Sequence, residues 1–324
     1  FLVALSEQNF LGRGQSVRLN IALGQDDTGS SFSFVEPALL GRDLRFGFDV
    51  GYVTTRANFA RYDTRSFTIS PSIEFPLSER TRLGLRYTLT NAAVFNVDAA
   101  RSSPVLVREQ AQGTPADSAV GYTLSWDNRR GGLALRDVVV LEFSQDVAGL
   151  GGGLTYLETR AKGIAQTRVL NNEVTLRAEI EGGVITPFGA TQPRVTERFS
   201  LNGRLRGFEP FGVGPRELRA GFPNQDALGG NVFAVARFEA QFPIGLPTEY
   251  GITGGVFADV GSVWSLTDTD GGAIDDSLRL RSAVGVSIFW DTPIGPLRFN
   301  FSRAIVKEAY DREQTFDFSI TTRF

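Results

Sequence analysis

Hydrophobic and polar residues alternate with a period of two along most of the chain. The clearest example is residues 82–90, where Leu and Tyr at odd positions are separated by Arg, Gly or Thr. Segments 44–52, 67–75 and 173–181 repeat the pattern. Such alternation is typical of antiparallel strands that have two different faces. Because no segment shows a convincing period of 3.6, we expect almost no helix.

The lengths of these runs favour strands that cross a membrane. The runs are about nine to twelve residues long, closer to the 9–11 residues of a membrane strand than to the 5–6 of a sandwich strand. The polar face also carries more charge than a packed sandwich core tolerates. We therefore predict a transmembrane antiparallel β-barrel with a wet lumen. The alternative is an all-β soluble protein with solvated outer faces.

The parity of each run assigns its side chains to one face of the barrel. The residues expected to face lipid are Leu83, Leu85, Leu176, Ile180, Phe299 and Phe301. Those expected to face the lumen are Arg82, Arg86, Arg177, Glu179, Arg298 and Asn300.

The connections between the runs alternate in length, as they do in bacterial barrels. Longer links are expected near 93–117, 185–230, 263–279 and 306–313. The short turns include 11–14, 40–42, 76–79, 127–132, 170–172 and 293–296. This division gives about fifteen strands, whereas bacterial single-chain barrels have even numbers. We expect one barrel domain over 1–324, with a sixteenth strand preceding Phe1.

Composition excludes several classes of chemistry. The chain has no Cys, His or Met among its 324 residues. Disulfides, thiolate sites and mechanisms based on a histidine are therefore ruled out, and we expect no enzyme and no cofactor. The net charge is −3 without a basic stripe, so no nucleic-acid binding is expected. The first residues show no signal peptide, which indicates a mature or excised piece of a longer protein.

The C-terminal strand carries a local signal. Phe316, Phe318, Ile320 and Phe324 share one parity, and Phe324 is the last residue. A terminal amphipathic strand that ends in Phe resembles the assembly signal of bacterial outer-membrane barrels. The alternative is an ordinary last strand of any β-protein.

Several motifs resemble the BamA family of outer-membrane protein assembly factors. The main one is Leu205-Arg206-Gly207-Phe208, followed by Gly214-Pro215-Arg216. Segment 257–264 is similar to an Asp-x-Gly-x-Val-Trp strand end, and Asn9 to Gly14 is similar to an early turn of the family. The resemblance implies that the first strand and the POTRA domains are missing here. Thr321 departs from the Gly of some members, which puts a bent last strand in doubt.

The long link 185–230 contains the candidate site. By parity, Glu239 and Asp259 face the lumen, where Arg206 in a folded tongue can pair with one or both. From the residues alone, a solvated surface arginine is the stronger interpretation. The resemblance instead implies that Arg206, Gly207 and Phe208 anchor the tongue to Glu239 and Asp259.

The resemblance also implies a function and a location. The protein is expected in the bacterial outer membrane as a β-barrel insertase whose first and last strands form a lateral gate. Its partners would be unfolded outer-membrane clients, assembly-complex lipoproteins bound through the absent POTRA domains, and membrane lipid. Two alternatives remain: a TamA-type autotransporter assembly factor, which Phe208 disfavours, and a two-partner secretion transporter or passive channel.

Overall fold

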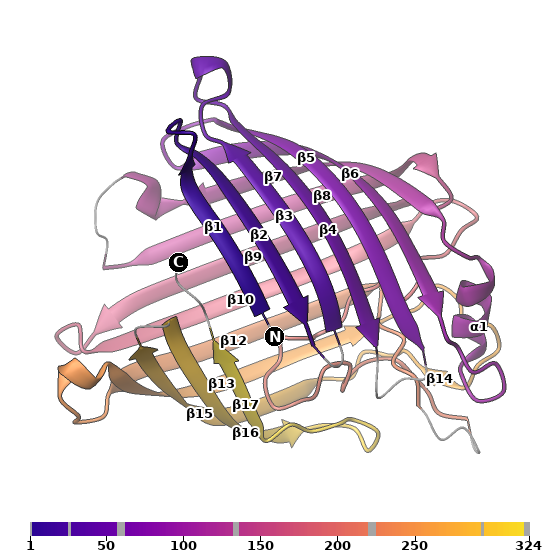
Figure 1. Ribbon diagram of the computed structural model, residues 1–324. Coiled ribbons are helices and arrows are strands. Elements are labelled where there is room, and N and C mark those ends of the chain that lie inside the picture. The colour runs from indigo at the N-terminus through magenta and orange to yellow at the C-terminus, as the bar shows by residue number, and fades with distance from the viewer. Residues whose placement is uncertain are drawn as a thin grey trace.

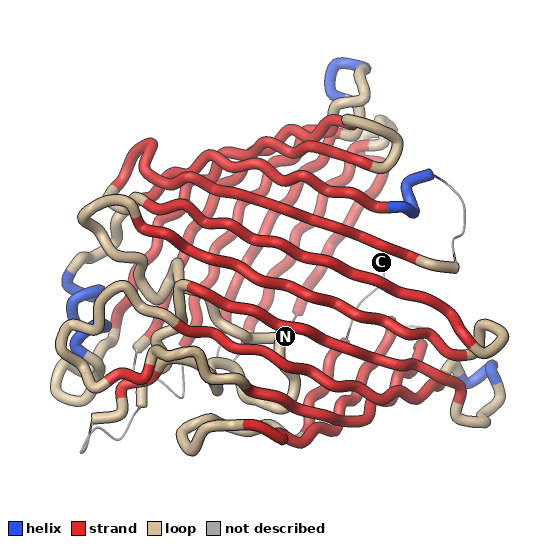
Figure 2. Tube along the Cα trace, turned by 180° about the vertical axis from the view of Figure 1, so that it is seen from behind, coloured by secondary structure: helices blue, strands red, loops and turns tan. Residues whose placement is uncertain are grey.

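The computed structural model describes residues 2–24, 27–56, 62–131, 136–219, 225–292 and 295–320. Over these residues, fifteen strands form one antiparallel sheet that curls into a barrel (Figures 1 and 2). Its strands are β1 (Leu2–Phe10), β2 (Gln15–Leu23), β3 (Asp27–Glu36), β4 (Arg45–Arg56), β5 (Asp63–Pro76), β6 (Thr81–Phe95), β7 (Ala116–Asp127), β8 (Val138–Gly152), β9 (Tyr156–Val169), β10 (Val174–Pro187), β12 (Val232–Pro243), β13 (Ile252–Trp264), β15 (Arg281–Thr292), β16 (Gly295–Val306) and β17 (Phe316–Ile320). The predicted all-β barrel fold and its strand number are confirmed.

The two faces of the sheet differ as the parity predicted. Leu85, Ile180 and Phe301 point outward and are about half exposed, with 48%, 60% and 46% of their surface accessible. On the inner face, Arg86 Nε donates to Asp146 Oδ1 at 2.8 Å across the strands. The lumen therefore holds paired charges, while the outer face is a continuous apolar belt suited to lipid.

The connections at the two ends of the barrel differ in length. Short turns include 11–14 and 170–173, and 3-10 turns occur at Leu39–Gly41, Asn128–Gly131 and Thr248–Tyr250. At the other end, 96–115, 188–231 and 265–280 are long, although 153–155 at the same end is short. The predicted turn at 293–296 lies partly outside the described residues, as does the end of the turn at 127–132.

The link between β6 and β7 contains a helix that the sequence analysis did not predict, α1 (Pro104–Ala111). Pro104 begins it at a position where no backbone donor is needed. Val105 and Leu106 are fully buried. Two adjacent apolar residues are too few to show a period of 3.6 in the sequence. Among the described residues, no helix is both long and apolar enough to cross a membrane.

Loops cover the barrel at the end that carries α1. There β11 (Arg216–Glu217) pairs with β14 (Ile274–Asp275), and Tyr62, Leu106 and Leu228 form a small apolar core. We call this covering the cap, which consists of residues 96–115, 188–198, 215–219, 225–231 and 265–280. Figure 1 shows α1 and β14 together at this end.

The two edge strands of the sheet are β1 and β17, which Figure 1 shows on the side facing the viewer. Within the described residues, β17 pairs with β16 through five residue pairs, from Leu297↔Ile320 to Phe301↔Phe316. The neighbouring ladder between β15 and β16 runs from Thr292↔Gly295 to Ser282↔Val306. The described part of β17 thus pairs with β16 and forms one edge of the sheet.

Candidate functional site

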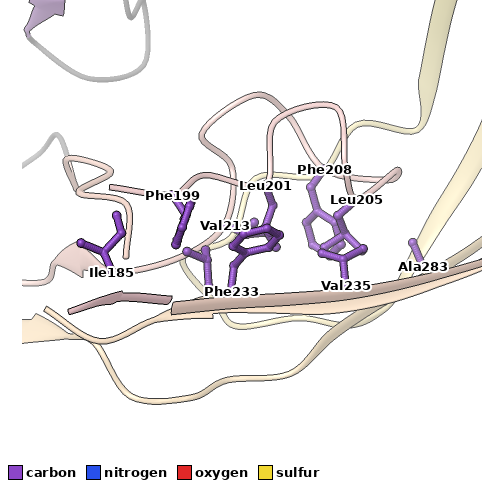
Figure 3. Close-up of a cluster of buried hydrophobic side chains, with 10 residues drawn as sticks. Ile185, Phe199, Leu201, Leu205, Phe208, Val213, Phe233, Val235 and Ala283 are labelled. Carbon is purple, nitrogen blue, oxygen red and sulfur yellow. The ribbon is translucent and has the colours of Figure 1, made fainter. Parts of the chain in front are cut away.

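The link between β10 and β12 enters the lumen as a folded segment, residues 199–214, which we call the tongue. Its base is fixed by the isolated bridge Phe199↔Gly230, where the Phe199 N–H donates to Gly230 O at 2.8 Å. From there the tongue lies along the inner wall formed by β10, β12, β13 and β15 (Figure 3).

An apolar core holds the tongue against this wall. Leu205 and Phe208 of the tongue are 4% and 6% exposed, and they pack with Phe233, Val235 and other wall residues. The ring centres of Phe199 and Phe233 are 4.7 Å apart. Full burial of such a side chain contributes about 1.5–3 kcal/mol. Strand parity does not predict this contact, because inward positions of a wet lumen are expected to face water.

Arg206 lies beside this core and bonds to both predicted acids. Its Nε and Nη2 donate to Oδ2 and Oδ1 of Asp259 at 2.6 Å each, and its Nη1 donates to Glu239 Oε2 at 2.5 Å. The Arg206 backbone N–H adds a bond of 3.2 Å to Asp259. Asp259 therefore receives the planar, bidentate contact that only arginine can make.

Arg206 remains charged in this setting. Burial by itself lowers the pKa of Arg206, but the bonds and charges of Asp259 and Glu239 outweigh burial and raise this pKa above its ordinary value. The guanidinium also stacks on Phe257, 3.7 Å from the ring centre. A desolvated contact of this kind contributes about 2 kcal/mol.

Gly207 allows the tongue to approach the wall closely. Its φ is +88°, and a Cβ there would lie 2.7 Å from the Cβ of Ala283. A side chain at this position would therefore push the tongue away from β15 and strain the backbone.

Arg298 of β16 completes the cluster. Its Nη2 contacts Glu239, its Nε donates to Asn300 Oδ1 at 2.8 Å, and it stacks on Phe289 at 4.9 Å. Parity placed Arg298 in the lumen, but no sequence signal linked it to Glu239. Glu239 is thus shared by two arginines from different parts of the chain.

Further ion pairs lie in the cap, where the sequence analysis named no site. Arg198 Nη1 bonds to Glu109 of α1 at 2.8 Å, and both side chains are almost fully buried. Arg194 bonds to Glu197 at 2.8 Å. Burial and the nearby Arg312 lower the pKa of Arg216 to about 10. These partners are far apart in the sequence or lie in irregular loops, so no periodic pattern announces them.

The residues of the proposed closing-strand signal are only partly visible. Phe316 and Phe318 point outward from β17 and stack on Phe301 and Phe299, with ring centres 5.3 and 5.0 Å apart. Ile320 pairs with Leu297 in the ladder. Phe324 and Thr321 lie outside the described residues. Among the described residues, no group of three or more acids is placed to hold a metal ion.

Comparisons with known proteins identify the family. The model of the Omp85 superfamily domain matches residues 9–324. The chain is 30% identical, over 96% of its length, to the outer membrane protein assembly factor BamA of Neorickettsia risticii (strain Illinois). It spans 41% of that relative, less than half of its length.

Solved structures agree on the fold. BamA of Haemophilus ducreyi lacking POTRA domains 1–3 matches with a TM-score of 0.76 at 22% identity, covering 98% of this chain and 66% of that one. CdiB of Acinetobacter baumannii matches with a TM-score of 0.60 at 12% identity, covering 98% and 55%. The predicted outer-membrane location is confirmed by these family relations. The chain belongs to the Omp85 superfamily, and its resemblance to the BamA family is confirmed.

Proposed function

We propose that this chain is the membrane barrel of an outer-membrane protein assembly factor, which folds client β-barrels and inserts them into the bacterial outer membrane. Family membership supports the general role in outer-membrane protein assembly. The observation that carries the specific proposal is that β17 forms one edge of the described sheet and pairs there with β16 on one side. Such an edge offers free backbone donors and acceptors to an incoming strand.

The clients in this proposal are unfolded outer-membrane proteins. A client strand would pair with the edge of β17, and the lateral gate would open between the last strand and the first strand of the whole protein. Assembly-complex lipoproteins would act through POTRA domains that precede the barrel. Membrane lipid would contact the apolar belt, and we propose that the bilayer thins beside it, as it does around proteins whose apolar band is short.

The main alternative is a passive channel or two-partner secretion transporter, with an open lumen as its working part. The tongue disfavours a wide-open lumen, since its apolar core and the Arg206 bonds hold it inside the barrel against the wall of β10 to β15. The TamA-type reading shares the barrel and the tongue, and differs in its clients.

Reconstitution separates the proposals. The full-length protein, with the residues that precede this barrel, is placed in liposomes and given a urea-unfolded client barrel. We expect protease-resistant, heat-modifiable client in its presence and little in empty liposomes. Ion or polypeptide conduction without client folding would reject the insertase. Folding of autotransporters alone, among several clients, would favour the TamA-type reading.

A further inference from the structure

The tongue touches the segment that leads into β17, residues 312–314. The Glu209 N–H donates to Arg312 O at 3.0 Å, the Arg312 N–H to Gly212 O at 2.9 Å, and the Gln314 N–H to Gly207 O at 3.0 Å. Phe208 and Glu313 form an isolated antiparallel bridge. The tongue and this segment therefore pair through their backbones like two short strands.

Ser302 of β16 holds the same segment from the other side. Its N–H donates to Thr315 O and its Oγ donates to Gln314 O, both at 2.9 Å. Residues 312–315 thus lie between the tongue and β16, immediately before β17 begins at Phe316.

A chain of side chains makes a second link between the tongue and β17. It starts at Arg206, passes through Glu239 to Arg298, and reaches Asn300. Asn300 is 3% exposed; its Oδ1 accepts from Arg298 and from Ser287 Oγ at 2.7 Å, and its Nδ2 donates to Asp317 Oδ2 at 3.0 Å. An amide is required here, because one end must accept two bonds while the other donates to a carboxylate.

We infer that the tongue positions the closing strand β17, and that Asn300 is the positioning residue that joins the two. This inference rests on the proposed function and deepens it by naming what sets the edge offered to a client. The links converge on the residues that lead into β17 and on Asp317 within it, so these hydrogen bonds add to the ladder with β16 and reduce how often the strand opens. Release of the tongue then frees the edge.

Amide hydrogen exchange of the full-length protein in liposomes, without client, tests this inference. Gly207→Ala is compared with Gly203→Ala, a matched control whose φ is +68° but whose added Cβ meets no atom within 4 Å. We expect peptides covering 312–320 to exchange about tenfold faster in Gly207→Ala than in Gly203→Ala, with β5 and β6 unchanged. Equal exchange in the two variants would overturn the inference.

Asn300→Asp provides an independent arm, because it sets two carboxylates against each other across β16 and β17. We expect faster exchange over 316–320, and slower exchange again when Asp317→Asn is added, since the swapped pair restores the bond with reversed polarity. Failure of Asp317→Asn to slow the exchange would also reject the role of Asn300. Hydrogen exchange is measured without client, so its outcome is independent of the reconstitution experiment. If exchange follows these expectations but the reconstituted protein folds no client, only the proposed insertase function is rejected.

Discussion

Among single residues, Glu239 has two partners, and this decides how its variants behave. It accepts from Arg206 of the tongue and contacts Arg298 of the wall. A charge swap that combines Arg206→Glu with Glu239→Arg therefore restores one pair but places the new arginine against Arg298. Glu239 holds the tongue and the wall together, and we expect its exchange for a cation to be tolerated poorly.

Substitutions of Arg206 test the anchor. Arg206→Glu places three acids together, and removing one partner from a largely buried pair costs about 3–5 kcal/mol. We expect the tongue to leave its seat and client folding to slow strongly, with Arg206→Lys intermediate because it keeps the charge without the planar fork. Client folding in liposomes gives the rate, and heat-modifiable gel mobility checks that the barrel is folded. Wild-type rates for Arg206→Glu would exclude the anchor from the mechanism.

Substitution of Phe208 tests the apolar core that holds the tongue against the wall. Phe208→Ala removes a ring that is 6% exposed, and such truncations cost about 3–5 kcal/mol. Limited proteolysis should then cut the tongue readily, whereas Leu218→Ala, at a side chain that is 38% exposed, should leave the cleavage rate unchanged. Equal cleavage rates in the two variants would mean that Arg206, without the ring of Phe208, holds the tongue against the wall.

The sequence could predict only part of this site. Parity placed Glu239, Asp259 and Arg298 on the lumen face, because strand geometry is a local property. It could not place Arg206, whose loop conformation depends on the wall it meets. The stacking of Arg206 on Phe257 arises only when the tongue folds back, so neither residue alone indicates it.

Among the elements, β17 combines two tasks, because it forms one edge of the described sheet and carries the apolar face of the proposed assembly signal. Phe316 and Phe318 stack on the neighbouring strand, so they already contribute to packing. Phe324 follows them in the sequence, and we expect its substitution to affect assembly rather than packing.

We predict that Phe324→Ala lowers the yield of assembled barrel per unit synthesised more than it lowers the stability of the folded protein. Phe318→Ala is the matched comparison, since it removes a packed ring from the same face and should mainly reduce thermal stability. Surface-exposed folded barrel is measured against total synthesis, and melting is followed by heat-modifiable mobility. Unchanged assembly of Phe324→Ala would argue against a signal at this position.

The sequence predicted the strands far better than the irregular elements. Alternation over long runs is strong evidence for strands, so the long strands such as β6 and β10 followed directly from it. The short helix α1 buries Val105, Leu106 and Glu109 on one face, but because Glu109 is charged, the hydrophobic pattern does not show a helical period. Its position depends on contacts that form only in the folded chain.

At the scale of the whole molecule, the tongue fills the part of the lumen that lies beside β10 to β15. We predict that the reconstituted barrel conducts little, and that replacing residues 200–213 by a Gly/Ser linker raises its conductance several-fold, since the replaced residues carry most of the tongue's core. Gly/Ser replacement of the exposed turn 244–246, at the opposite end, serves as the control. Planar-bilayer recordings give the conductance, and equal conductance would show that the tongue does not obstruct the lumen.

The one-sided seat of the tongue has a mechanical consequence. Its core lies on strands from β10 to β16, whereas the inner faces of β1 to β5 border a polar cavity of about 610 Å³. A densely packed wall resists bending, while a wall lined by water and long side chains is compliant. The barrel is therefore expected to deform unevenly, with the C-terminal half moving as a stiff shell and the N-terminal half flexing beside it.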